Sequence, residues 1–206
     1  MKKIFLYLLV LFVTFSCNIK KEKTSEELLL DKKTEYTSTL NTNSNFELRD
    51  SSSLLSIKLL STEREYRNEV RQLVANKKLK YLNRKLIYDM GDVYSAPAYC
   101  EVIPKFHNGK LYKLVLNLEF YDTTNAGIIL GDLARTTGLY DMMKNIYGGN
   151  NFYIYDKEYS DLMVSWINNG KEVLVRNGSI YYTALKEEKS MESESSLKTL
   201  EVIKGL

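Results

Sequence analysis

Apolar and polar residues alternate in several segments of the chain, and three Asn-Gly pairs separate those segments. The pairs are at 108–109, 169–170 and 177–178. Alternation with a period of two is typical of strands with one buried face, and Asn-Gly is typical of tight hairpin turns. The second and third pairs give registers that agree, because Trp166 then faces Val173 while Val175 faces Ile180. We therefore predict a three-stranded meander over 161–185. Its buried face would consist of Leu162, Val164, Trp166, Val173, Val175, Ile180 and Tyr182.

The first Asn-Gly pair lies in a predicted hairpin over 98–120, for which two registers compete. A two-residue loop would place Val102 opposite Val115, with the apolar residues of the two strands on opposite faces. A three-residue loop would pair Val102 with Leu114 and bring the apolar residues onto one face. We therefore predict the three-residue loop. Cys100 alternates with Val102 and is predicted to be buried as a small apolar residue.

Apolar residues spaced three and four apart predict a helix near 62–76. Thr62 and Glu65 form a capping box at its start. The apolar stripe that follows consists of Tyr66, Val70, Leu73 and Val74. The preceding segment, 54–60, is rich in leucine and favours one or two further helical turns.

A second helix is predicted near 125–147. Its stripe consists of Leu139, Met143 and Ile146. Gly148-Gly149 marks its end, because glycine readily takes the left-handed conformation that terminates helices. The short segment 152–155 then favours a strand.

The predicted order is therefore helix, hairpin, helix, meander, which is typical of an α+β fold. The hairpin 98–120 and the meander 161–185 would form an antiparallel sheet packed against the two helices. A helix followed by a hairpin occurs twice, and Asn-Gly-Lys recurs at 108–110 and 169–171. An internal repeat is therefore an open alternative.

The N-terminus has the pattern of a targeting segment. Two lysines precede an apolar run of about a dozen residues, 4–15, whereas a membrane-spanning helix needs about 20. Ser16 and Cys17 follow directly. This arrangement resembles the lipobox of bacterial lipoproteins, although Thr14 and Phe15 stand where leucine and a small residue are commonest. The resemblance implies cleavage before Cys17 and a diacylglyceryl group on its thiol. An ordinary signal peptide or a signal anchor is the alternative.

This reading divides the chain into four parts. A signal peptide covers 1–16, and a lipidated cysteine with a flexible tether covers 17–50, because 34–45 is mostly Thr, Ser and Asn. The α+β domain covers 51–185. An acidic tail with a short amphipathic helix covers 186–206. The expected location is the cell envelope, at the outer membrane or cell surface rather than the inner membrane.

Composition narrows the chemistry. The 206 residues include one histidine and two cysteines, too few for most zinc sites built from these ligands. The formal net charge of +3 is small for a nucleic-acid-binding protein. The sequence contains no motif of a serine hydrolase, zinc protease, phosphate loop or dinucleotide site. We therefore predict no metal, cofactor, catalytic residue or nucleic-acid partner.

Two sets of residues are candidates for binding. The chain has sixteen tyrosines, and a cluster of exposed aromatic residues is typical of binding surfaces. The candidate aromatic surface consists of Tyr147, Phe152, Tyr153, Tyr155 and Tyr159. The second set lies within 58–85, a segment that contains nine lysines and arginines but only three glutamates. The candidate basic face consists of Arg64, Arg67, Arg71, Lys77, Lys78, Lys80, Arg84 and Lys85.

The function that these features favour is a lipid-anchored envelope protein with a non-catalytic binding module for a protein or a surface polymer. Two alternatives remain open. One is an envelope hydrolase that uses carboxylates the sequence does not identify. The other is an inhibitor or immunity-type protein with one tight partner.

Overall fold

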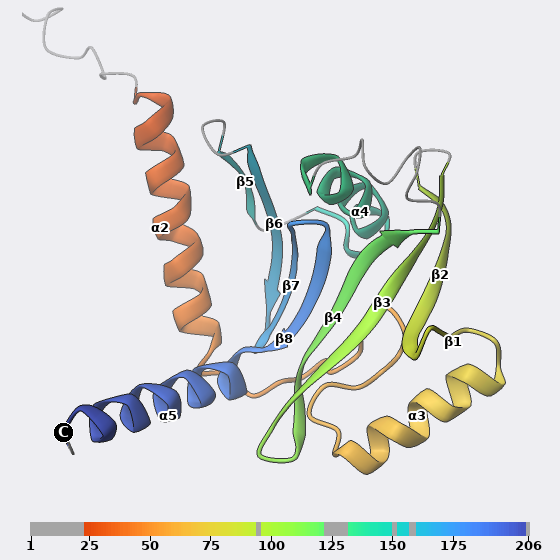
Figure 1. Cartoon of the computed structure of the whole chain (residues 1–206). Coiled ribbons are helices and arrows are strands. Elements are labelled where there is room, and N and C mark those ends of the chain that lie inside the picture. The colour runs from red at the N-terminus through yellow and green to blue at the C-terminus, as the bar shows by residue number, and fades with distance from the viewer. Residues whose placement is uncertain (1–22, 94–95, 122–131, 150–151, 157–159, 205–206) are drawn as a thin grey trace, which may run out of the picture.

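One open antiparallel sheet forms the centre of the molecule. The computed structural model describes residues 23–93, 96–121, 132–149, 152–156 and 160–204. Within these residues, eight strands form the sheet and four helices pack against it (Figure 1). The predicted α+β fold with an antiparallel sheet is therefore confirmed.

The helices are α2 (Ser25–Asn43), α3 (Glu63–Ala75), α4 (Asp132–Tyr147) and α5 (Leu185–Lys204). The strands are β1 (Lys80–Leu82), β2 (Lys85–Val93), β3 (Ala96–His107), β4 (Lys110–Phe120), β5 (Phe152–Asp156), β6 (Asp161–Asn168), β7 (Lys171–Arg176) and β8 (Ser179–Ala184).

Two four-stranded meanders make up the sheet. The strand order is β1-β2-β3-β4-β8-β7-β6-β5, so the meanders meet through their last strands, β4 and β8. Each meander follows a helix, α3 in the first and α4 in the second, so the order of elements repeats (Figure 1). The recurring Asn-Gly-Lys does not follow this order. Asn108-Gly109 joins β3 to β4, and its equivalent in the second meander is Asn177-Gly178 rather than Asn169-Gly170.

The meander predicted over 161–185 is confirmed as β6, β7 and β8. Trp166 pairs with Val173, and Val175 pairs with Ile180. All seven residues of the predicted face are buried, with relative exposures no higher than 7%. The strand predicted at 152–155 is also present, as β5.

The three-residue loop predicted for the first hairpin is wrong. The turn has two residues, Asn108-Gly109. Farther from the turn, Val102 pairs with Leu116 rather than with Leu114, because the register shifts and leaves Tyr112 without a partner in β3. This bulge brings the apolar residues of both strands onto one face. The prediction that the apolar residues of both strands share one face was therefore correct. The bulge in β4, rather than a longer loop, produces that register.

Both predicted helices are present in the described residues. The capping box of α3 forms as predicted, and Tyr66 and Val70 are buried. In α4, Leu139 and Met143 are buried, whereas Ile146 is 49% exposed, so the predicted stripe is wrong at its last position. The segment 122–131, where that helix was predicted to begin, lies outside the described residues.

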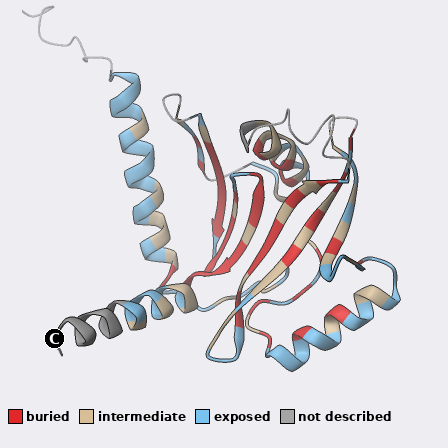
Figure 2. Ribbon diagram, in the orientation of Figure 1, coloured by how far each residue is buried: buried red, intermediate tan, exposed pale blue. Residues whose placement is uncertain are grey.

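The two helices α3 and α4 contribute to a single hydrophobic core on one face of the sheet. This core also takes in alternate residues of the central strands, where burial is concentrated (Figure 2). Cys100 is fully buried there, as predicted, and burial raises the pKa of its thiol to about 12. Residues 54–60 contribute to the same core, but as turns rather than the predicted helix. Leu60 donates its backbone N–H to the carbonyl of Leu111 at 2.8 Å.

The flexible tether predicted over 17–50 is wrong for 25–43, which form α2. Thr24 and Glu27 cap the helix through a capping box. α2 packs against β5 and β6, while α5 packs against β4 and β8. These helices cover the sheet face opposite the main core, over the second meander. The predicted tail also differs, since a helix begins at Leu185, directly after β8.

The contact between α2 and the sheet centres on Tyr36. Its ring meets Phe152 edge to face, with 5.4 Å between ring centroids. Its hydroxyl donates a hydrogen bond of 2.6 Å to Glu172, which also accepts one of 2.8 Å from Ser165. Lys33 adds an ion pair of 3.0 Å with Asp156. Glu172 is 5% exposed, and its burial raises the pKa of its carboxyl group.

Replacing Trp166 by alanine should strongly destabilise the protein. Trp166 is 7% exposed and lies between Tyr140 and Tyr147, with ring centroids 6.4 and 5.8 Å away. Removing a buried aromatic ring typically costs about 3–5 kcal/mol. Chemical denaturation would measure the loss. A variant as stable as the wild type would contradict the packing, and Leu48→Ala, at the edge of the core, should cost less.

The Glu172 carboxyl group should make stability depend on pH. Because its pKa is raised in the folded state, its contribution is fully present below the ordinary pKa and is lost as pH rises through the raised value. Glu172→Gln retains an acceptor for Tyr36 and should remove this loss. Thermal melts of the wild type and of Glu172→Gln from about pH 4 to pH 9 test this pH dependence of stability. The expected result is a gap between the curves that shifts in favour of the variant at high pH. A pH-independent gap would contradict it, and Glu35→Gln on exposed α2 surface is the control.

Candidate functional site

The four described residues of the candidate aromatic surface do not form one surface. Tyr153 and Tyr155 are 44% and 38% exposed on β5. Phe152 points to the opposite face and is buried against α2. Tyr147 is half-buried at the end of α4. Tyr159 lies outside the described residues.

Two of these tyrosines belong to an aromatic cluster at the edge of the core. The ring of Tyr153 meets Tyr140 at 5.5 Å, and Tyr147 meets Trp166 at 5.8 Å. The indole nitrogen of Trp166 is buried and finds no hydrogen-bond acceptor among the described residues. The cluster is therefore mainly a packing feature. The exposed parts of Tyr153 and of Tyr155, which also lies on β5, remain accessible to a partner.

The basic residues, in contrast, are partly brought together. A hollow of about 540 Å³ lies between α3, the β1–β2 hairpin and β3. Four residues of the candidate basic face line it: Arg67, Arg71, Arg84 and Lys85. Tyr66 and Tyr81 line it as well, together with Leu86 and the strand segment 101–104. We call this hollow the basic groove.

The helical repeat of α3 determines where Arg67 and Arg71 lie relative to the groove. Tyr66 and Val70 point into the core and fix the orientation of the helix. Tyr66 packs edge to face on Phe106, with ring centroids 5.5 Å apart. Arg67 and Arg71 each follow a buried residue by one position, so they lie on the flank of the helix that borders the sheet. Both are exposed.

The β1–β2 turn places the other two cations. Leu82 pairs with Lys85, so Asn83 and Arg84 form a two-residue turn. Their φ angles are 49° and 67°, the left-handed conformation that such turns need. Asparagine tolerates this conformation, whereas arginine is strained in it by about 1–2 kcal/mol. Leu60 and Lys77 share this conformation, so the strain at Arg84 is compatible with a functional role but does not by itself indicate one.

The charges of the groove are only partly neutralised. Lys85 pairs with Glu101 at 2.6 Å, and this hydrogen bond raises the pKa of the lysine. Arg67 approaches Glu63 at 3.4 Å along the exposed face of α3. Arg71 and Arg84 have no acidic partner in the part of the chain that the structure describes. The groove therefore carries two free guanidinium groups, which can form two parallel hydrogen bonds to a carboxylate or a phosphate.

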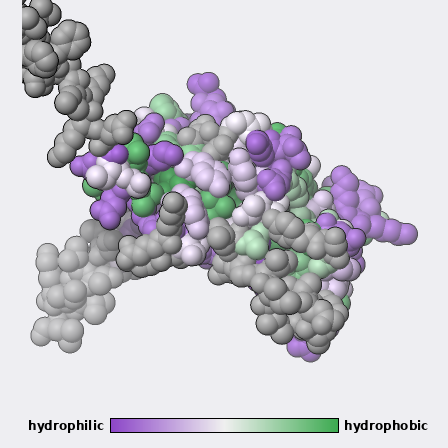
Figure 3. Space-filling model, turned by 90° about the horizontal axis from the view of Figure 1, so that it is seen from above, coloured by the Kyte–Doolittle hydropathy of each residue, from purple (hydrophilic) through white to green (hydrophobic). Residues whose placement is uncertain are grey.

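The remaining basic residues lie outside the groove. Lys80 forms an ion pair of 2.9 Å with Asp89, and its ammonium lies 5.2 Å from the ring centre of Tyr121. Lys77 and Lys78 are exposed after the end of α3. Arg64 lines an adjoining hollow with Arg67 and Arg71. Seen from above, purple hydrophilic side chains project from several sides of the molecule, the right-hand side among them (Figure 3).

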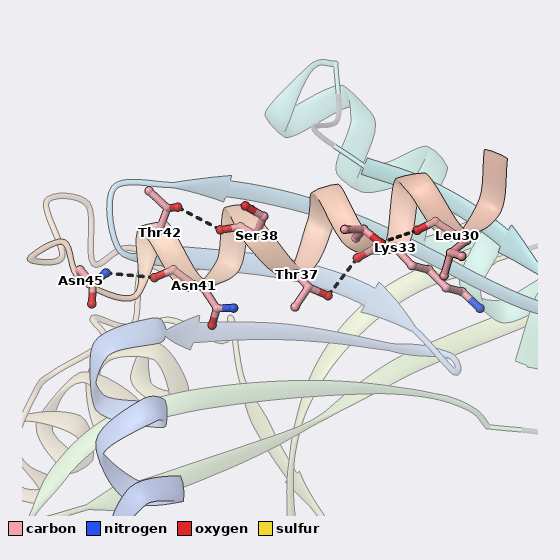
Figure 4. A pocket seen from close by; sticks show the side chains of 8 residues that line it. Leu30, Lys33, Thr37, Ser38, Asn41, Thr42 and Asn45 are labelled. Carbon is pink, nitrogen blue, oxygen red and sulfur yellow. Dashed lines mark hydrogen bonds between the residues drawn. The ribbon is translucent and has the colours of Figure 1, made fainter. Parts of the chain in front are cut away.

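A larger hollow, of about 740 Å³, follows the outer face of α2 (Figure 4). Four of its hydroxyl and amide side chains, those of Thr34, Thr37, Thr42 and Asn45, already donate to carbonyls of this helix. Thr37 donates to Lys33 at 2.9 Å, and Thr42 donates to Ser38 at 3.0 Å. Such bonds leave few polar groups for a ligand. This hollow is therefore a weaker candidate than the basic groove.

Carboxylates and metal ligands do not converge in the described part of the chain. There, no group of three or more His, Cys, Asp or Glu side chains could hold a metal ion. Glu172 has the raised pKa expected of a general acid, but it lies beneath α2 and bonds to Tyr36 and Ser165. Its environment is that of a buried structural acid rather than a group facing a substrate.

No protein-family model, curated protein or solved structure matches this chain. Among the described helices, none is both long enough and apolar enough to cross a membrane. Cys17, the predicted site of lipidation, lies outside the described residues. The interpretation of the groove therefore depends on its geometry and charge.

Sequence reasoning identified the cations of the groove but missed Tyr81. This side chain is 64% exposed on β1, beside Arg84. A signal was available, because a tyrosine between two lysine- and arginine-rich segments is typical of an aromatic surface within a basic patch. The strand itself was not predicted, so the tyrosine had no assigned position.

Proposed function

We propose that this chain is a lipid-anchored protein of the cell envelope whose domain is a non-catalytic binding module, and that the basic groove binds an anionic ligand. The observation that carries the proposal is the placement of Arg71 and Arg84. They come from a helix and from a hairpin turn, line the same groove and have no acidic partner within the described residues.

The position of α2 supports a particular orientation of the module. α2 begins at the end of the molecule opposite α3 (Figure 1). Only seven residues, 18–24, separate Cys17 from Ser25, and an extended chain spans at most about 3.6 Å per residue. A lipid on Cys17 would therefore hold the α2 end within about 30 Å of the bilayer surface. Because the groove lies beside α3, far from this end of α2, a surface polymer or a partner could still reach it (Figure 1).

The alternatives differ in what they require. A hydrolase requires carboxylates that converge on an open cleft, and an inhibitor requires a surface that fits one enzyme. The exposed Tyr153 and Tyr155 would suit the second of these, because exposed tyrosine is enriched at protein interfaces. We favour anion binding at the groove over these two alternatives, because Arg71 and Arg84 line it without an acidic partner in the described residues.

Replacing Cys17 by alanine tests the anchor. The apolar run that ends at Ser16-Cys17 is the basis of this expectation. The variant should lose fatty-acid labelling and move from the membrane fraction to the soluble fraction. Cys100→Ala is the matched control, because that buried thiol should not carry lipid. Labelling that persists in Cys17→Ala would contradict the lipoprotein assignment.

Replacing Arg84 by glycine separates binding from stability. Glycine relieves the left-handed strain, so the variant should gain about 1 kcal/mol of stability. It should also lose binding to an anionic matrix, measured as the salt concentration that elutes the full chain in neutral detergent. Asn83→Gly changes the same turn without removing charge and is the control. Arg84→Gly with unchanged elution would contradict a role for the groove.

A further inference from the structure

We infer that the ligand of the basic groove is a linear acidic polysaccharide whose repeating units carry carboxylates. The inference rests on the proposed function and specifies its ligand. The supporting features are a row of arginines, an exposed tyrosine with an apolar floor, and the shape of the nearby sheet edge.

The arginines form a row rather than a single point. Arg64, Arg67 and Arg71 are three and four residues apart, so they lie along one side of α3 over about 10 Å. A second hollow, of about 400 Å³, runs beside α3 and shares Arg67 and Arg71 with the groove. We treat the two hollows as one track because they share these two arginines; Glu63 also lines the second hollow, and Arg84 lines the groove from the β1–β2 turn. A ligand with charges repeated along its length would use the whole track.

The type of cation favours an anion whose two oxygens accept parallel hydrogen bonds, as those of a carboxylate or a phosphate do. Three cations on α3 and one in the turn are arginine rather than lysine. The guanidinium group is planar and matches the two oxygens of a carboxylate, whereas an ammonium group acts as a point charge. The uronic acids of acidic polysaccharides present one such carboxylate on each sugar ring.

The wall of the groove adds contacts that a purely charged ligand would not need. Tyr81 is 64% exposed, and Leu86 and Pro104 line the same hollow. A tyrosine ring offers an apolar face together with a polar tip. A sugar ring has the matching properties, since one face presents C–H groups while its edge carries hydroxyls. A polyphosphate has no such face.

An extended acidic peptide fits this region less well. An acidic peptide could use the arginines alone, but the mode that gives an extended peptide backbone hydrogen bonds is the addition of a strand to a sheet edge. The edge strand here, β1, has only three residues, and it ends at the strained turn. A peptide would find few backbone partners, so a polysaccharide is favoured.

The test measures binding of an eight-residue oligogalacturonate to the full chain in neutral detergent. The wild type should bind the acid and should not bind its fully methyl-esterified form, which has the same sugar rings without the charges. Arg71→Gln and Arg84→Gln should each weaken binding at least about tenfold. Tyr81→Ala should weaken it about fivefold or more, whereas Tyr81→Phe should retain most of it.

Two further ligands and one control variant complete the experiment. Poly-glutamate with eight carboxylates and polyphosphate of matched charge should bind more weakly than the oligogalacturonate. Lys78→Gln removes a charge of the same segment outside the groove and should leave binding unchanged. Thermal melts confirm that each variant is folded.

The outcomes distinguish the ligand class from the groove itself. Equal binding of poly-glutamate or polyphosphate, with Tyr81→Ala unaffected, would overturn the polysaccharide while leaving an anion-binding groove. Absence of oligogalacturonate binding by the wild type, or equal binding of the methyl ester, would also overturn it. Binding that is insensitive to Arg71 and Arg84 would remove both this inference and the proposed function.

Discussion

The pairing of β4 with β8 is the contact on which the rest of the structure depends. Each meander alone would have four strands and two open edges. The pairing joins them, since Leu114 faces Tyr182 and Leu116 faces Ile180 at the centre of the core. All four residues are fully buried. Because α3 and α4 then share one continuous core, the position of the groove on α3 is fixed by contacts that include the second meander.

The opposite sheet face is organised by a polar contact. Glu172 is the second residue of β7, and it would keep only the hydrogen bond from Ser165 on β6 if α2 covered it with apolar side chains alone. Tyr36 and Ser165 supply the hydrogen bonds that make its burial tolerable. α2 contributes no fully buried residue of its own, so this contact and the ring of Phe152 are central to holding it on the sheet. The same contact determines where the chain emerges towards Cys17.

The sequence was sufficient to predict strand pairing where the turn residues and the alternation of apolar residues indicated the same register. Asn169-Gly170 and Asn177-Gly178 each fix a two-residue turn, and the resulting registers support each other, so β6 to β8 were predicted pair by pair. The first hairpin has the same kind of turn, but the bulge at Tyr112 shifts its register, and a bulge leaves no distinct mark in an alternating pattern.

Other elements were missed for related physical reasons. β1 and β2 are joined by Asn83-Arg84, a turn without glycine, and a register shift between Asp89 and Gly91 interrupts the alternation of β2. α2 has a polar composition that is typical of disordered segments, and its helix depends on a capping box and on docking against distant strands. For the site, the sequence supplied the cations. Only the tertiary structure separates Arg71 and Arg84, which line the groove, from Lys80, which pairs with Asp89.

The groove lies on the first meander, which helices cover less extensively than the second. The second meander has helices on both faces, α4 on one and α2 with α5 on the other. In the described residues, α3 packs against the first meander on the core face, and on the other face α5 reaches β4. Segments with less burial open more easily and tolerate strain less well. A left-handed arginine at an exposed turn of this meander therefore lowers stability where little is in reserve. A use of the side chain would offset this cost, and the use that we propose for Arg84 is the recognition of an anion in the groove.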